Sequence, residues 1–150
     1  NVIGYNRGVD EVENGQYDKT EQTEIATGCC MLIKRQTIEK VGLFDEKYFL
    51  YYEDADLSIR TRKNGYKIMY ASSSVIWHKN AGSAGGSGSV LQDYYISRNR
   101  MLFGFKYSPL RSKLSLVRES FKILINGRKW QKRGVLDFYL GKFGKGSFLA

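Results

Sequence analysis

The sequence predicts an α/β protein in which a short mixed sheet is followed by helices. Short apolar or β-branched runs between turns, the pattern of buried strands, recur in the first 90 residues. Apolar residues at helical spacing, set among Lys and Arg, fill the last 60. With 150 residues and 42% hydrophobic content, the chain is apolar enough to bury a core, which excludes a disordered protein.

The expected elements of the first part begin after a polar, acidic loop over residues 1–24. The apolar run 25–33 is typical of a buried strand. It contains Cys29 and Cys30, which have no partners at zinc-ligand spacing and are expected to be small buried hydrophobes. Residues 36–41 predict a short helix that Gly42 ends in a left-handed conformation.

A second helix is expected from Glu53 to about Asn64, because acidic residues are favoured in a first helical turn. Asp56 and Arg60 lie four residues apart and can pair on one face. Two strands follow, at 66–71 and 74–78, and then a glycine-rich loop at 80–89.

The last 60 residues predict helices at 91–107 and 111–125, separated by Pro109, and a further apolar and basic segment at 133–146. We therefore divide the chain into residues 1–90 and a basic amphipathic helical region, 91–150. The first part holds 11 Lys+Arg and 12 Asp+Glu, whereas the second holds 13 and 3. Such a basic block suits nucleic acid, a membrane surface or another polyanion, and a solvated helical surface is the alternative.

Three carboxylates, Glu53, Asp54 and Asp56, lie within four residues beside the aromatic stretch 48–52. Such a cluster needs a helix N-terminus, a cation, a metal or a raised pKa to offset its repulsion. A carboxylate beside an apolar wall can act as a general base. The spacing of Asp54 and Asp56 is also the D-x-D of nucleotide-linked metal sites, and a solvated helix start is the alternative.

His78 is the single histidine, and it stands between a predicted strand and the glycine-rich loop. Strand ends beside loops are where sites form in α/β folds, although a lone histidine is more often structural. The loop is a lid or a linker, and it lacks the spacing of a phosphate-binding P-loop.

From about Ala26 onward, the sequence resembles the inverting family 2 glycosyltransferases, in particular a rhamnosyltransferase-like branch that acts on bacterial surface polysaccharides. The motifs that carry the resemblance are Thr27-Gly28, Leu32–Arg35, Val41–Glu46, Tyr48–Leu57, Arg60, Gly65–Lys67, Trp77–Lys79, Gly82-Ser83, Tyr94-Tyr95, Arg98-Asn99, Gly134–Asp137 and Gly141–Lys145. The resemblance implies the C-terminal half of a GT-A (Rossmann-like) domain.

The resemblance implies that Asp54, next to Glu53, is the general base, that Asp56 is structural, and that His78 is a metal ligand. It also implies substrate contacts from Gly28, Tyr51, Tyr52, Gly82, Ser83 and Arg98. The cofactor would be a divalent metal, Mn²⁺ or Mg²⁺. The partners would be a nucleotide-sugar donor and a saccharide or lipid-linked acceptor.

Residues 1–24 hold neither the family's nucleotide-binding βαβ units nor its D-x-D, which supplies the main metal ligands. We therefore expect a fragment that is inactive alone. The helical region 91–150 is expected to lie on an anionic membrane surface, at the cytoplasmic face of the plasma membrane, or to pack on protein. Nucleic acid is the less favoured partner, and the oligomeric state stays open. The rival interpretation is a non-enzymatic basic module that binds membrane or nucleic acid.

Overall fold

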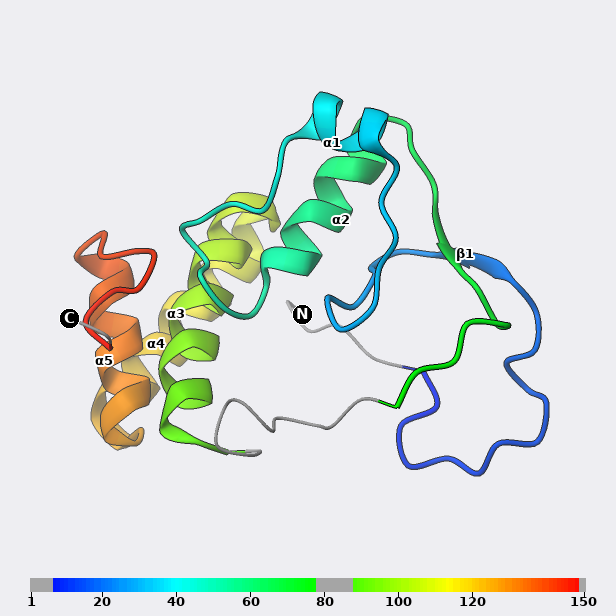
Figure 1. Cartoon of the computed structure of the whole chain (residues 1–150). Coiled ribbons are helices and arrows are strands. Elements are labelled where there is room, and N and C mark those ends of the chain that lie inside the picture. The colour runs from blue at the N-terminus through cyan, green and yellow to red at the C-terminus, as the bar shows by residue number, and fades with distance from the viewer. Residues whose placement is uncertain (1–6, 78–87, 149–150) are drawn as a thin grey trace. The chain divides into compact units, whose positions relative to one another are not determined.

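The computed structural model describes residues 7–77 and 88–148. The elements, in chain order, are β1 (Glu21–Thr23), α1 (Arg35–Val41), α2 (Glu53–Lys63), β2 (Ile68–Tyr70), α3 (Val90–Tyr107), α4 (Leu110–Asn126) and α5 (Lys129–Tyr139) (Figure 1). The described chain forms two units, which we take separately. The mixed unit contains residues 7–44 and 54–77, and the helical unit contains residues 45–53 and 88–148.

The sheet of the mixed unit consists of β1 and β2, which run antiparallel with Thr23 opposite Ile68 and Glu21 opposite Tyr70. The expected mixed sheet is therefore, within the described residues, a two-stranded antiparallel one. β2 lies inside the strand predicted at 66–71, whereas β1 falls in the segment predicted as loop. The α/β class is confirmed at this coarse level.

Two strand predictions are wrong. Residues 25–33 form no strand, and Cys29 and Cys30 are exposed rather than buried. The physical reason is that two N–H groups of this run are bound by side chains of α2 instead of a neighbouring strand. Residues 74–77 are also irregular and begin in a turn, in which the Ser74 N–H donates to the Ala71 carbonyl.

The four predicted helices are confirmed as α1, α2, α3 and α4. Each was predicted from caps, stops and periodicity within its own segment. α1 ends at Gly42, whose φ of 79° is the left-handed conformation expected there. α3 begins after Ser89, whose hydroxyl accepts a hydrogen bond from the Gln92 N–H. α4 begins directly after Pro109. Among the residues that the structure describes, no helix combines the length and the apolar character needed to cross a membrane.

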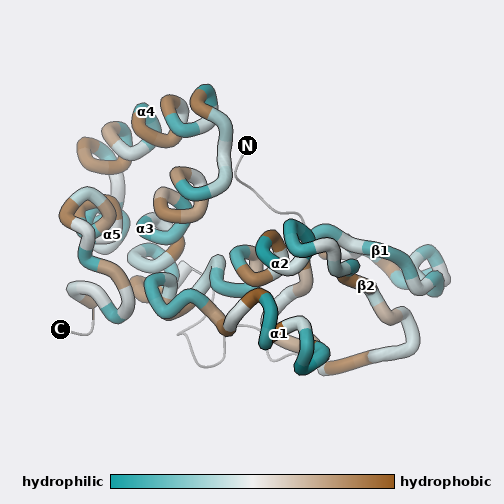
Figure 2. Tube along the Cα trace, turned by 90° about the horizontal axis from the view of Figure 1, so that it is seen from above, coloured by the Kyte–Doolittle hydropathy of each residue, from teal (hydrophilic) through white to brown (hydrophobic). Residues whose placement is uncertain are grey.

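The helical unit packs α3, α4 and α5 around a small core. Met101 of α3 and Leu116 of α4 are its buried centre, and Phe103, Phe105 and Phe138 surround them. Ser120 of α4 contacts the Tyr139 hydroxyl of α5 at 2.7 Å. α3 and α5 approach closely at Gly134, where an added Cβ would lie 2.3 Å from the Tyr94 carbonyl oxygen. Hydrophobic and hydrophilic residues alternate along α4 (Figure 2).

Candidate functional site

Asp54 stands in the first turn of α2, in the mixed unit, and is half-buried. Its Oδ2 accepts a hydrogen bond of 2.9 Å from the main-chain N–H of Gly28, and its Oδ1 accepts one of 2.7 Å from the Ala55 N–H. The structure thus brings together two residues, Asp54 and Gly28, that the sequence singled out separately. A Cβ at position 28 would meet Asp54 only in ordinary van der Waals contact. The N–H of Gly28, rather than its missing side chain, therefore makes this contact.

A second contact one turn along α2 fixes the same segment. The Ala26 N–H donates to the Ser58 hydroxyl at 3.1 Å, and Ser58 is buried. Because residues four apart share a helix face, Asp54 and Ser58 together hold residues 26–28 along α2. The resemblance did not include Ser58 among the site residues, and nothing in its local sequence marks it.

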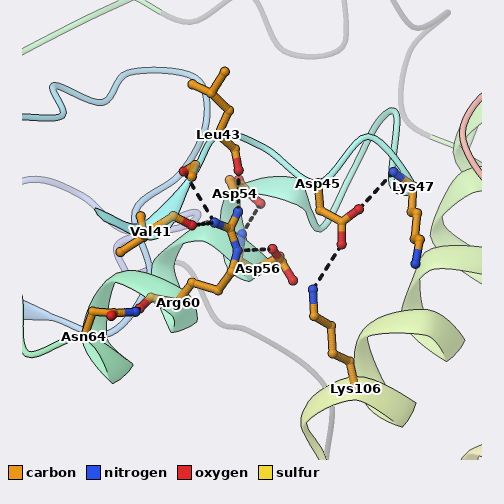
Figure 3. A network of polar contacts seen from close by, with 11 residues as sticks. Val41, Leu43, Asp45, Lys47, Asp54, Asp56, Arg60, Asn64 and Lys106 are labelled. Atoms are coloured by element: carbon orange, nitrogen blue, oxygen red, sulfur yellow. Dashed lines mark hydrogen bonds and ion pairs between the residues drawn. The ribbon is translucent and has the colours of Figure 1, made fainter. Parts of the chain in front are cut away.

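Asp56 serves the fold of the mixed unit. It is fully buried, and its Oδ2 accepts a hydrogen bond of 2.7 Å from the Arg60 Nε (Figure 3). The Arg60 guanidinium also donates to the carbonyls of Val41, Gly42 and Leu43 at the end of α1, where a cation suits the helix dipole. The predicted pairing is confirmed. This pairing occupies Asp56 and leaves Asp54-Ala55-Asp56 unsuited to act as a metal-binding D-x-D.

No group of three or more His, Cys, Asp or Glu within residues 7–77 and 88–148 could hold a metal ion. The described residues therefore do not fit a metal site on their own. The proposed metal ligand, His78, and the proposed donor-loop residues, Gly82 and Ser83, lie outside the described residues.

The loop that leads into α2, residues 45–52, belongs to the helical unit and is held there by two neighbouring side chains of α3. The Asn99 amide nitrogen donates to the carbonyls of Tyr48, Leu50 and Tyr51 at 2.8, 2.7 and 2.9 Å. The Arg98 Nη2 donates to the Tyr48 carbonyl at 2.9 Å. Asp45, at the start of the loop, pairs with Lys106 at 3.1 Å (Figure 3).

This anchoring accompanies a strained backbone. Phe49, Tyr51 and Tyr52 have φ of 62°, 66° and 73°, a region that aromatic residues rarely occupy. Each such residue costs on the order of 1–3 kcal/mol, and such strain clusters at functional sites. The strained residues come immediately before Glu53 in the sequence, and hydrogen bonds from Asn99 of α3 hold the main chain at Leu50 and Tyr51.

Tyr51 and Tyr52 are half-buried, and the Tyr52 ring contacts Phe103 with 5.4 Å between ring centroids. Burial raises the pKa of Tyr52 above its ordinary value. Arg98 is fully buried, and this burial lowers its pKa. Because its guanidinium is bound to main-chain carbonyls, Arg98 acts in this structure as a positioning residue for the loop and not as a group open to substrate.

A buried polar network lies behind Arg98. The Asp137 carboxylate accepts hydrogen bonds from the Tyr94 hydroxyl and from the Ser147 N–H, the latter at 2.9 Å. Burial, with the bond to Asp137, raises the pKa of Tyr94 to about 12. Burial alone would raise the pKa of Asp137, but the bonds from Tyr94 and Ser147 outweigh it and hold that pKa below its ordinary value. This network ties α3, α5 and the segment after α5 together.

Comparison with known families places residues 8–104 in the family described as glycosyltransferase like family 2. The chain belongs to this family. The match contains the Gly28–Asp54 contact, the strained loop and the anchoring pair Arg98 and Asn99. The family resemblance inferred from the sequence is confirmed.

Two relatives of this family 2 chain are glycosyltransferases by name. It is 42% identical over 59 residues to the N-acetylglucosaminyl-diphospho-decaprenol L-rhamnosyltransferase of Mycobacterium tuberculosis (strain ATCC 25618 / H37Rv). These 59 residues make up 39% of the chain and 19% of the relative. It is 30% identical over 54 residues to the low-salt glycan biosynthesis hexosyltransferase Agl10 of Haloferax volcanii. These 54 residues make up 36% of the chain and 18% of that relative. The match spans about a fifth of each relative's length. No solved structure matches the chain.

Proposed function

We propose that the complete protein carrying this chain is an inverting glycosyltransferase with a GT-A fold, in which Asp54 is the general base. The observation that carries the proposal is the Asp54 carboxylate, held by the Gly28 N–H at the start of α2 in a chain of family 2. One Asp54 oxygen takes the proton of the acceptor hydroxyl. The hydroxyl oxygen forms its bond to the anomeric carbon as the bond from that carbon to the donor's diphosphate breaks.

The proposed donor is a nucleotide-sugar, and the proposed acceptor is a saccharide linked through a diphosphate to a lipid. The printed name of the mycobacterial relative, which acts on N-acetylglucosaminyl-diphospho-decaprenol, supports this acceptor class. Synthesis of a cell-envelope polysaccharide is the corresponding process.

A divalent cation is part of the proposal, with His78 as one ligand, on the strength of the resemblance alone. A cation would stabilise the charge that develops on the leaving diphosphate. Replacing His78 with Ala should then raise the Mn²⁺ concentration that half-maximal transfer requires. An unchanged Mn²⁺ response would remove His78 as a ligand.

We also propose that α4 rests on an anionic membrane surface at the cytoplasmic face of the plasma membrane. Its apolar residues Leu110, Phe121 and Ile125 are 72%, 58% and 71% exposed, and Leu114 is 56% exposed. Arg111, Lys113, Arg118 and Lys122 flank them. An exposed apolar ridge with flanking cations suits the boundary between headgroups and acyl chains.

The function is tested by offering the complete protein a panel of nucleotide-sugars together with a diphospholipid-linked N-acetylglucosamine acceptor. We expect one donor to yield a longer lipid-linked saccharide whose new bond has the inverted anomeric configuration, read by mass spectrometry and NMR. Retention of configuration would contradict the assignment of a single carboxylate base. No transfer from any of the donors would contradict the proposed function itself.

A further inference from the structure

The helical unit has a cavity of about 690 Å³ at the start of α5, which is widely open to solvent. Its lining includes Lys129, Trp130, Lys132, Arg133 and Leu136. Three of these side chains are cationic, two are apolar, and none of the lining residues is acidic. A volume of this size is in the range of small-molecule sites, which run from roughly 300 to 1,000 Å³.

Hydrogen bonds hold two of the three cationic side chains, and the third, Lys129, is exposed. The Lys132 Nζ donates to the Ile125 carbonyl at 2.8 Å, and the Arg133 Nη2 donates to the Ser147 hydroxyl at 2.8 Å. The Lys129 Nζ lies 5.8 Å from the centre of the Trp130 ring. The Asp137 carboxylate is buried, lies 3.5 Å from the Arg133 Nε and already accepts the bonds from Tyr94 and Ser147.

The walls of the cavity are fixed by packing around the start of α5. The Arg128 guanidinium donates through two nitrogens to the Asp93 carboxylate of α3. The turn at Gly127 is tight, since an added Cβ would lie 2.5 Å from the Ile123 carbonyl oxygen. The Trp130 ring packs on Phe148, with 4.8 Å between centroids. A site built on such fixed elements loses little entropy when it binds a ligand.

We infer that this cavity binds the diphosphate of the lipid-linked acceptor, an inference that rests on the proposed function. Lys129, Lys132 and Arg133 would neutralise the phosphate oxygens through charge-assisted hydrogen bonds. Trp130 and Leu136 would contact the first hydrocarbon units of the lipid. The mixture of three cations with an indole and a leucine matches a ligand that is anionic at one point and apolar next to it.

The test measures ligand binding through the fluorescence emission of Trp130, which lines the cavity. Trp77, the other tryptophan, is 96% exposed in the mixed unit and is replaced by Phe. The protein is titrated with farnesyl diphosphate, inorganic pyrophosphate and a nucleoside diphosphate while the Trp130 emission is followed. We expect saturable binding of farnesyl diphosphate, tighter than that of pyrophosphate because the hydrocarbon is also bound.

The double variant Lys129→Gln/Lys132→Gln should weaken binding of farnesyl diphosphate at least about tenfold, since each lost charged hydrogen bond weakens binding substantially. Lys19→Gln/Lys40→Gln removes the same charge from exposed positions of the mixed unit and should change the affinity for farnesyl diphosphate less than about twofold. Far-ultraviolet circular dichroism checks that both variants keep their helices. The single substitution Lys129→Glu, at an exposed position, should likewise weaken binding of farnesyl diphosphate.

Three results would overturn the inference. Equal weakening by the two double variants would show that binding follows net charge. Tighter binding of the nucleoside diphosphate than of farnesyl diphosphate would assign the cavity to a nucleotide. Unchanged Trp130 emission with every ligand would show an empty cavity.

A transfer assay on the complete protein separates this inference from the proposed function. Lys129→Gln/Lys132→Gln should raise the KM for the diphospholipid acceptor while kcat and the KM for the donor stay unchanged. Transfer with an unchanged acceptor KM would overturn the cavity assignment and leave the function standing. No transfer by the unmodified protein would overturn the function, whatever the cavity binds.

Discussion

Asn99 shows how a single side chain can set the conformation of a loop. Its amide nitrogen faces three carbonyl oxygens, and its Oδ1 accepts a hydrogen bond of 2.9 Å from the Arg98 Nε. Both residues are fully buried, so water cannot replace these bonds. The resemblance marked Arg98-Asn99 as a family motif and Arg98 as a substrate contact. It did not indicate the anchoring role, because the carbonyls that the pair binds are about 50 residues away.

Asn99→Asp tests the anchoring of this loop. The substitution keeps the shape of the side chain but turns a carboxylate oxygen toward three carbonyl oxygens. Since each unsatisfied buried group costs about 1–3 kcal/mol, we expect the free energy of unfolding to fall by about 3 kcal/mol or more in urea titrations. The exposed Asn126→Asp at the end of α4 is the control, and equal losses in the two variants would contradict the account.

Tyr94 contributes stability that is lost at alkaline pH. The folded-state pKa is about 12 against an ordinary 10.0, so its contribution to stability is complete below pH 10 and is lost as the pH rises through 12. Asp137 acts in the opposite range, because its lowered pKa gives stability that is lost as the pH falls below the ordinary 3.8.

Urea titrations at a series of pH values test the Tyr94 contribution. The free energy of unfolding should decline between pH 10 and 12 more steeply in the unmodified protein than in Tyr94→Phe. Parallel declines in the two proteins would show that other tyrosines account for the alkaline loss.

Among the elements, the close packing of α3 against α5 depends on Gly134. Alanine at position 134 would gain about 1 kcal/mol of helix propensity. It would also place a Cβ 2.3 Å from the Tyr94 carbonyl oxygen, a main-chain atom that no rotamer change can move. The overlap is the larger effect, because overpacking against a main-chain atom typically costs about 1–3 kcal/mol.

Gly134→Ala should therefore destabilise the helical unit by about 1–3 kcal/mol, measured by urea denaturation. Ser115→Ala, at an exposed position of α4, makes a smaller gain in helix propensity without a clash and should leave stability unchanged or slightly raised. A more stable Gly134→Ala protein would contradict the close crossing of α3 and α5.

The apolar ridge of α4 makes a separate prediction about membranes. Phe121→Ser/Ile125→Ser should reduce flotation with vesicles of anionic phospholipid at least about tenfold, since burial of each such side chain contributes about 1.5–3 kcal/mol. Leu32→Ser, at a fully exposed position of the mixed unit, should leave flotation unchanged. Flotation that falls equally in both proteins would contradict a membrane contact through α4.

At the scale of the whole molecule, the sequence predicts those elements whose signals lie within their own segment. The helices at 35–41, 53–63, 90–107 and 110–126 follow from caps, periodicity and Gly or Pro stops within each segment. The strand predicted at 25–33 fails because strand pairing depends on distant partners, and Asp54 and Ser58 bind this segment instead. The resemblance named Gly28 and Asp54 as separate site residues, whereas their contact, the role of Ser58 and the anchoring role of Asn99 follow only from the three-dimensional structure.

The central claim is that Asp54 is the general base of a glycosyl transfer. Asp54→Asn keeps the side-chain shape and an oxygen that can accept the Gly28 N–H, but it cannot take a proton at neutral pH. Asp18→Asn, at an exposed position of the same unit, is the matched control. The measurement is kcat for sugar transfer by the complete protein, with the donor dissociation constant measured alongside. We predict a loss of about 10²–10⁴-fold in kcat for Asp54→Asn, with donor binding within about twofold. A kcat within threefold of the unmodified protein would contradict the account.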